Sequence, residues 1–65
     1  MGANLAPEIF RLLRQAGCKF VRHGKGSHEI WFSPINQKKV VVPSTTKKRH
    51  TANEILSQAG LKKHF

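Results

Sequence analysis

Gly24-Lys25-Gly26-Ser27-His28 is the stretch that organises the fold, because it predicts a tight turn between two strands. Two glycines within three residues permit backbone conformations that other residues resist. Residues 18–23 (CKFVRH) before the turn contain Phe and Val and predict a first strand. Residues 27–33 (SHEIWFS), rich in aromatic and β-branched side chains, predict a second. The turn therefore closes a hairpin and delivers His28 to the start of its second strand.

A third strand is predicted at residues 38–42 (KKVVV). Pro34-Ile35-Asn36-Gln37 supplies the turn before it, and Pro43 ends it because proline has no N–H to donate to a neighbouring strand. Three strands joined by short turns predict an antiparallel meander. Along the second strand, one face carries His28, Ile30 and Phe32, and the other carries Glu29, Trp31 and Ser33. Both faces hold large apolar groups, so the pattern leaves open which one is covered.

Two amphipathic helices flank these strands. Apolar side chains at positions 9, 12, 13 and 16 form one stripe of a helix predicted for residues 7–16, and Pro7 suits its first turn. The same spacing recurs at positions 52, 55, 56 and 59. Thr51 is expected to cap this second helix, with Glu54 as its reciprocal partner in a capping box.

Both helices end in Gln-Ala-Gly, so Gly17 and Gly60 are predicted to stop them with the same C-cap. Cys18, directly after the first stop, is expected to be a small buried residue, and residues 62–65 (KKHF) a frayed tail. The order is α-β-β-β-α: one α+β domain, residues 1–65, with two helices on one face of a three-stranded antiparallel sheet. Double-stranded RNA-binding domains share this layout, which is an analogy of fold and not of activity.

The composition indicates a polyanionic partner. The chain has twelve Lys and Arg residues and three acidic residues, which gives a net charge of +9 with the histidines neutral. Nucleic acid is the leading partner, ahead of an acidic protein or an anionic membrane surface. The single cysteine cannot form an internal disulfide, no apolar run approaches a membrane span, and the start of the chain lacks a secretion signal. We therefore expect a cytoplasmic protein with no membrane partner.

His28 is the best candidate for a catalytic group. The glycines before it allow a ligand to approach closely, and a strand sets the direction of its side chain. Imidazole titrates near neutral pH, which suits removal of a proton from an RNA 2′-hydroxyl. The competing interpretation, as for any histidine, is a surface residue without a chemical role. Metal binding by His23 and His28 is a rival interpretation, but no second Cys and no Asp/Glu cluster completes a ligand set, so we expect no metal and no small-molecule cofactor. A Ser-His-Asp triad is excluded because the chain has no aspartate.

Cations near the turn and before the second helix are candidate RNA contacts. Arg22 and Lys25 lie beside His28 in the sequence, and Gly26 and Ser27 complete that group. Lys47-Lys48-Arg49 leads into the positive end of the second helix, where phosphates bind readily, although a solvated loop explains the same run. Trp31 or Phe32 could stack on bases, but whichever faces the helices is expected to be core.

At Gly26-Ser27-His28 the chain resembles the HicA family of messenger-RNA interferase toxins, also called YcfA-like proteins. The resemblance also covers Leu13 to Gly17, Phe20 and Arg22, the valine strand ending at Pro43, and Ile55 to Leu61. It implies the toxin of a type II toxin–antitoxin pair: an endoribonuclease of double-stranded RNA-binding-domain type that cuts mRNA and so blocks translation.

The resemblance further implies that His28 is catalytic and that a HicB-like antitoxin protein covers the active site. It gives no role to Lys47, Lys48 or Arg49, and His50 stands where members often have glycine. Two rival hypotheses remain: a non-catalytic RNA-binding module, and a subunit that mainly binds a protein partner.

Overall fold

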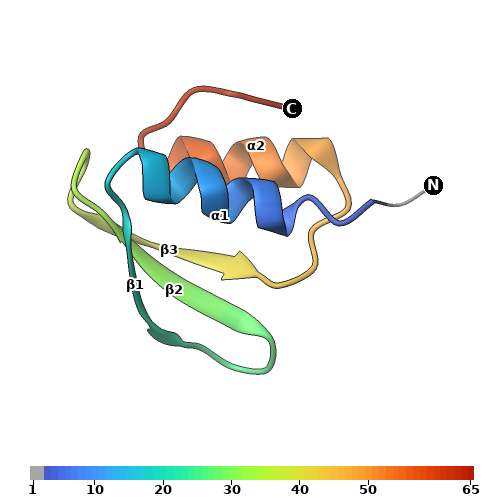
Figure 1. Ribbon diagram of the computed structural model, residues 1–65, viewed down its shortest axis with the longest axis horizontal. Helices are drawn as coiled ribbons and strands as arrows, with labels where there is room; N and C mark the ends of the chain where they lie inside the picture. The colour runs from blue at the N-terminus through green and yellow to red at the C-terminus, as the bar shows by residue number, and fades with distance from the viewer. Residues whose placement is uncertain (1–2) are drawn as a thin grey trace.

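The computed structural model describes residues 3–65 and has its helices and strands in the predicted order (Figure 1). The elements are α1 (Ala6–Gln15), β1 (Lys19–His23), β2 (His28–Ser33), β3 (Lys38–Pro43) and α2 (Arg49–Gln58). The strands form one antiparallel sheet in the order β1-β2-β3. The α-β-β-β-α prediction is confirmed, and residues 1–2 of the predicted domain lie outside the described part of the chain.

Both helices lie side by side on one face of the sheet and run in the same direction (Figure 1). Trp31 and Ser33 of β2 and Val40 and Val42 of β3 are buried beneath them, while the alternating residues are more exposed. The face of β2 that holds Trp31 is therefore the covered one, and the face that begins with His28 is open. The apolar stripes of the helices complete the core with Ile9, Leu13, Ala52, Ile55, Leu56 and Ala59.

Both helices end in the predicted C-cap. Gly17 has φ +89° and Gly60 has φ +83°, conformations that glycine adopts without steric cost. The residue after each glycine donates its N–H back to the last turn, at 2.9 Å from Cys18 to Leu13 and 2.8 Å from Leu61 to Leu56. Cys18 is 5% exposed, which confirms the predicted burial.

The predicted N-cap of the second helix is wrong. Helix α2 begins at Arg49, and its N-cap residue, Lys48, makes no side-chain capping hydrogen bond in the described structure. Thr51 lies inside the helix instead of at its start. The connector is fixed just upstream, where the Thr46 N–H donates to Oδ1 of Asn4 at 2.9 Å. The helix therefore starts two residues before the position that the local capping signal indicated.

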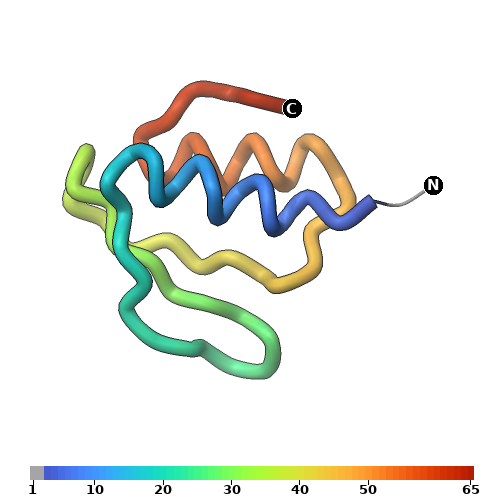
Figure 2. The backbone as a smooth tube through the Cα atoms, viewed as in Figure 1, coloured from blue at the N-terminus to red at the C-terminus, as the bar shows by residue number. Residues whose placement is uncertain are grey.

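The predicted frayed tail is also wrong, because residues 62–65 fold back along α2 (Figure 2). Oδ1 of Asn53 accepts the N–H groups of His64 at 3.1 Å and Phe65 at 3.0 Å, and Nδ2 donates to the Phe65 carbonyl at 3.2 Å. Half-buried Phe65 packs against the core. Within residues 3–65, no helix is long and apolar enough to cross a bilayer.

Candidate active site

His28 is exposed at the start of β2, on the open face of the sheet. Its cross-strand neighbour on β3 is Pro43, while the next residue, Glu29, pairs with buried Val42 on the opposite face. The backbone around it is fixed, since its N–H donates to the Lys25 carbonyl at 3.1 Å and its carbonyl accepts the Gly24 N–H at 2.9 Å. A rigid strand end thus holds an accessible imidazole.

The two glycines of the turn have different roles. Gly26 has φ +60°, so it provides the left-handed backbone conformation that the turn requires. A Cβ atom at Gly24 would lie 3.5 Å from both Cβ of His28 and Cδ1 of Ile30. Gly24 therefore lies against the base of the His28 side chain, and the open space of the turn is at Gly26, where a Cβ atom would meet nothing within 4 Å.

An irregularity in β1 moves Arg22 onto the same face as His28. Phe20 pairs with Trp31 on the helix side, and the register then shifts so that Arg22 pairs with Ile30 on the open side. In a regular strand, Phe20 and Arg22 would point to one face. A bulge that re-aims a side chain in this way is common beside functional sites. The Arg22 guanidinium also donates to the carbonyl of His23 at 3.3 Å.

The segment between β3 and α2, residues 44–48, is hydrogen-bonded to the glycine turn. The N–H of Ser44 donates to the carbonyl of Ser27 at 3.1 Å, which joins the end of β3 to the turn. A shallow groove of about 320 Å³ starts at Pro43, the neighbour of His28, and runs to the start of α2. Its lining includes Lys47 and Lys48. The groove therefore extends from the cross-strand neighbour of His28 to two lysines, although His28 itself does not line it.

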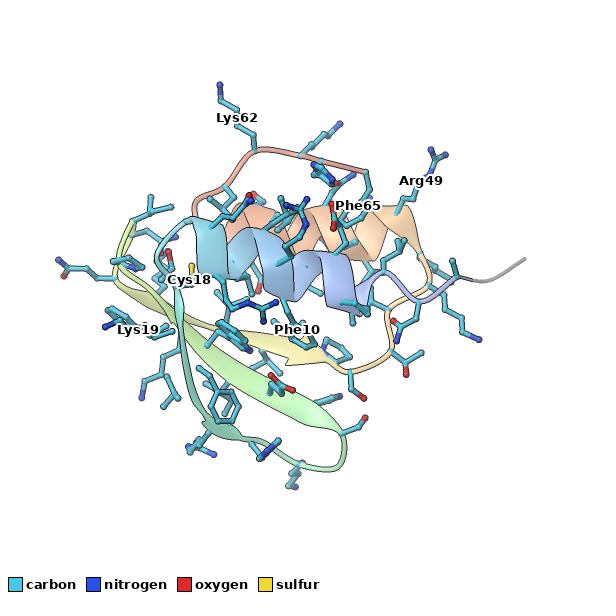
Figure 3. All side chains as sticks on the ribbon, in the orientation of Figure 1. Phe10, Cys18, Lys19, Arg49, Lys62 and Phe65 are labelled. Atoms are coloured by element: carbon cyan, nitrogen blue, oxygen red, sulfur yellow. The ribbon has the colours of Figure 1, made fainter. Side chains whose placement is uncertain are left out.

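Arg49 is placed away from this group. It projects from the helical side of the molecule, above α2 and away from the sheet (Figure 3). There it lines a separate hollow of about 490 Å³ with Asn53, Lys63 and Phe65. The structure thus places His28, the glycine turn and Arg22 together at one end of the β1–β2 hairpin, with Lys47 and Lys48 in the connector beyond Pro43 and Arg49 on the helical side.

Trp31, Phe32 and His64 differ in their surroundings. Trp31 is buried, stacks on Phe10 with ring centroids 5.6 Å apart, and donates from Nε1 to Glu29 at 3.0 Å, whereas Phe32 is exposed. His64 contacts Glu8 at 2.9 Å on the helical side. In residues 3–65, no three His, Cys, Asp or Glu side chains cluster so that they could hold a metal ion.

A perturbed acid lies on α1 and not at the candidate site. The hydrogen bond from Arg11 lowers the pKa of Glu8 to about 2, and the contact with His64 adds to the effect. The same pairing raises the pKa of Arg11. Both side chains are partly exposed, so this pair is a surface network on the far side of the helices.

The comparison with known families decides the identity of the chain. The family model described as HicA toxin of bacterial toxin–antitoxin matches residues 6–61 of the 65 residues. The chain belongs to the HicA toxin family. No curated protein and no solved structure matched it.

Membership of the HicA family places this chain in a bacterial toxin–antitoxin system and implies a cognate antitoxin partner. The matched residues run from the start of α1 to just past α2, so they include every strand and helix described above. The HicA chain also has features that its sequence did not reveal: the bulge in β1 and the hydrogen bond between Ser44 and Ser27. Each depends on strand pairing, for which the local residue pattern contains no signal.

Proposed function

We propose that this HicA-family protein is an endoribonuclease that cuts mRNA and so blocks translation. The observation that supports it best is the setting of His28: an exposed imidazole on a rigid strand end, next to a turn in which Gly26 faces open space. Its net charge of +9 favours a polyanionic substrate. The cytoplasm, where messages are translated, is the proposed place of action.

In the proposed mechanism His28 is the general base. Its imidazole removes the proton from a 2′-hydroxyl, and the resulting oxygen attacks the adjacent phosphorus. The bond to the 5′-oxygen then breaks, and that oxygen takes a proton from water or from a nearby lysine. The products carry a 2′,3′-cyclic phosphate and a 5′-hydroxyl. Lys25 and Arg22, which flank the imidazole along the hairpin, would stabilise the negative charge on the phosphate. These steps use protein side chains and water alone.

The groove beside Pro43 supports a site for the flanking phosphates. Lys47 and Lys48 line it, and it ends at the first turn of α2, where backbone N–H groups favour anions. Gly26 and Ser27, in the turn next to His28, would offer backbone groups as further contacts. RNA would then lie across this end of the sheet, and Arg49 would take no part in that contact.

The partner that we propose is a HicB-like antitoxin that covers His28. An acidic surface on the antitoxin would complement the same cations that bind RNA. The antitoxin and the message would then compete for one surface, so inhibition requires no change in the fold of the toxin.

Cleavage of a labelled message by purified protein tests the proposal. Wild type is compared with His28→Ala and, as a matched control, with His50→Ala, whose imidazole is largely exposed on α2. We expect wild type and His50→Ala to cut equally, in EDTA as well as without it, and His28→Ala to lose at least ~100-fold in rate.

Three results would contradict parts of this proposal. Intact RNA with all three proteins would favour the non-catalytic RNA-binding module. Equal cleavage by all three would remove His28 from the mechanism. Products with 3′-hydroxyl ends, or loss of activity in EDTA, would exclude metal-independent transesterification.

A further inference from the structure

The open face of the sheet has an aromatic ring between two lysines. Phe32 in the central strand pairs with Lys19 of β1 on one side and with Lys39 of β3 on the other. Residues that pair directly across antiparallel strands have side chains on the same face, about 5 Å apart. The three side chains therefore form one row across the sheet, at the end of β2 opposite His28.

Apolar side chains continue from this row towards His28. Ile30 is half-buried and pairs with Val41, which is 49% exposed, and Phe32 itself is 36% exposed. The helices and the C-terminal segment lie on the other side of the sheet (Figure 1). Exposed apolar surface of this kind, bordered by charged residues, is typical of an interaction site.

The charges on this face have one sign. Lys19, Arg22 and Lys39 all lie on it. The three acids of the chain lie elsewhere: Glu8 is in α1, Glu54 is in α2, and Glu29 is bonded to Trp31 on the covered face. A surface that combines cations with an exposed aromatic ring fits a partner that combines phosphates with flat unpaired bases.

We infer that the open sheet face binds single-stranded RNA, with one unpaired base stacked on Phe32 and neighbouring phosphates held by Lys19 and Lys39. This deepens the proposed function and rests on it, because the strand would continue to His28. Phe32 lies four positions after His28 in β2, roughly 13 Å away, which a single strand spans within a few nucleotides. A duplex fits less well, since its bases are stacked on each other and offer no free face to the ring.

Binding and stacking are measured with a short single-stranded RNA that contains one 2-aminopurine, whose fluorescence falls when it stacks. All proteins contain His28→Ala, so that the RNA stays intact. Phe32→Leu keeps apolar bulk without an aromatic face, and Phe32→Trp restores one. Phe20→Leu is the matched control, because Phe20 is also exposed, at 45%, but pairs with Trp31 on the other face.

We expect Phe32→Leu to weaken binding roughly 5- to 150-fold and to abolish the quenching, as the loss of one stacked base predicts. Phe32→Trp should retain both, and Phe20→Leu should change neither. Lys39→Ala should lower the slope of log affinity against log salt by about 0.7, the value for one phosphate contact on a single strand. Lys62→Ala, on the helical side (Figure 3), should leave the slope unchanged.

Unchanged binding and quenching in a folded Phe32→Leu protein would overturn the inference, and so would equal binding of the same RNA as a duplex. Loss of affinity for the antitoxin but not for RNA would assign the face to the protein partner instead. A failure of the proposed nuclease function can be distinguished from a failure of this inference. If Phe32 proves necessary for binding but wild type leaves RNA uncut, the surface stands and the nuclease proposal does not.

Discussion

Gly60 lies where α2 meets the loop between β2 and β3, and alanine at this position is expected to destabilise the protein more than alanine at Gly17. Both glycines have left-handed backbones and equivalent hydrogen bonds. They differ in surroundings: a Cβ atom at Gly17 would lie 3.6 Å from Pro34, an ordinary contact, whereas at Gly60 it would lie 2.8 Å from Cγ2 of Ile35. Comparing alanine at Gly17 with alanine at Gly60 therefore separates the cost of a left-handed backbone from the cost of a steric clash with Ile35.

The magnitudes follow from these geometries. A left-handed non-glycine residue costs about 1–2 kcal/mol, and the stiffer unfolded chain offsets about 0.4–1 kcal/mol of it. Gly17→Ala should therefore destabilise by about 1 kcal/mol. Overpacking adds about 1–3 kcal/mol at Gly60, towards the lower end because Ile35 is half exposed and can shift. Gly60→Ala should thus cost about 2–3 kcal/mol, most of the ~3–5 kcal/mol available to so small a domain.

Urea unfolding at about 15 °C, near the usual temperature of maximum stability, measures these differences. The His28→Ala background allows the proteins to be expressed without toxicity under the proposed function. Ile35→Ala removes the clashing methyl group, so the double variant with Gly60→Ala should regain about 1 kcal/mol beyond additivity. Equal losses at Gly17 and Gly60, or no coupling with Ile35, would refute the role of this contact.

Three further predictions concern other contacts. Ser33→Ala should cost about 1–3 kcal/mol in urea unfolding, because the buried hydroxyl donates to the carbonyl of Ala59 at 2.6 Å and its loss leaves that oxygen unpaired. Asn53→Ala should release the C-terminal segment, seen as faster hydrogen exchange at amides 64 and 65; unchanged exchange would contradict its anchoring role, and RNA cleavage should not change. Arg11 lowers the pKa of Glu8 from 4.5 to about 2, so the folded state gains stability above the higher value. The small, salt-sensitive advantage of wild type over Glu8→Gln should therefore fade as pH falls from about 4.5 towards 2, and an advantage that persists at pH 2 would rule out this linkage.

The sequence predicted the elements because they depend on local rules. Apolar spacing marked both helices, glycines with positive φ stopped them, and β-branched and aromatic runs marked the strands. The same rules placed His28 at the start of a strand after a flexible turn. They failed at the start of α2, which begins at Arg49, two residues before the predicted cap at Thr51.

Only the tertiary structure decided what surrounds His28. Both faces of β2 hold large apolar groups, so the sequence left Trp31 and Phe32 equivalent until the helices covered one of them. The bulge in β1 depends on pairing between strands, and it alone turns Arg22 onto the open face. The C-terminal segment depends in the same way on Asn53 in α2. Residue type sets the backbone φ preferences, and spacing along the chain sets which side chains share a face of a helix or strand. The choice of covered sheet face, the register between strands and the position of the C-terminal segment depend on contacts between residues that are distant in the sequence.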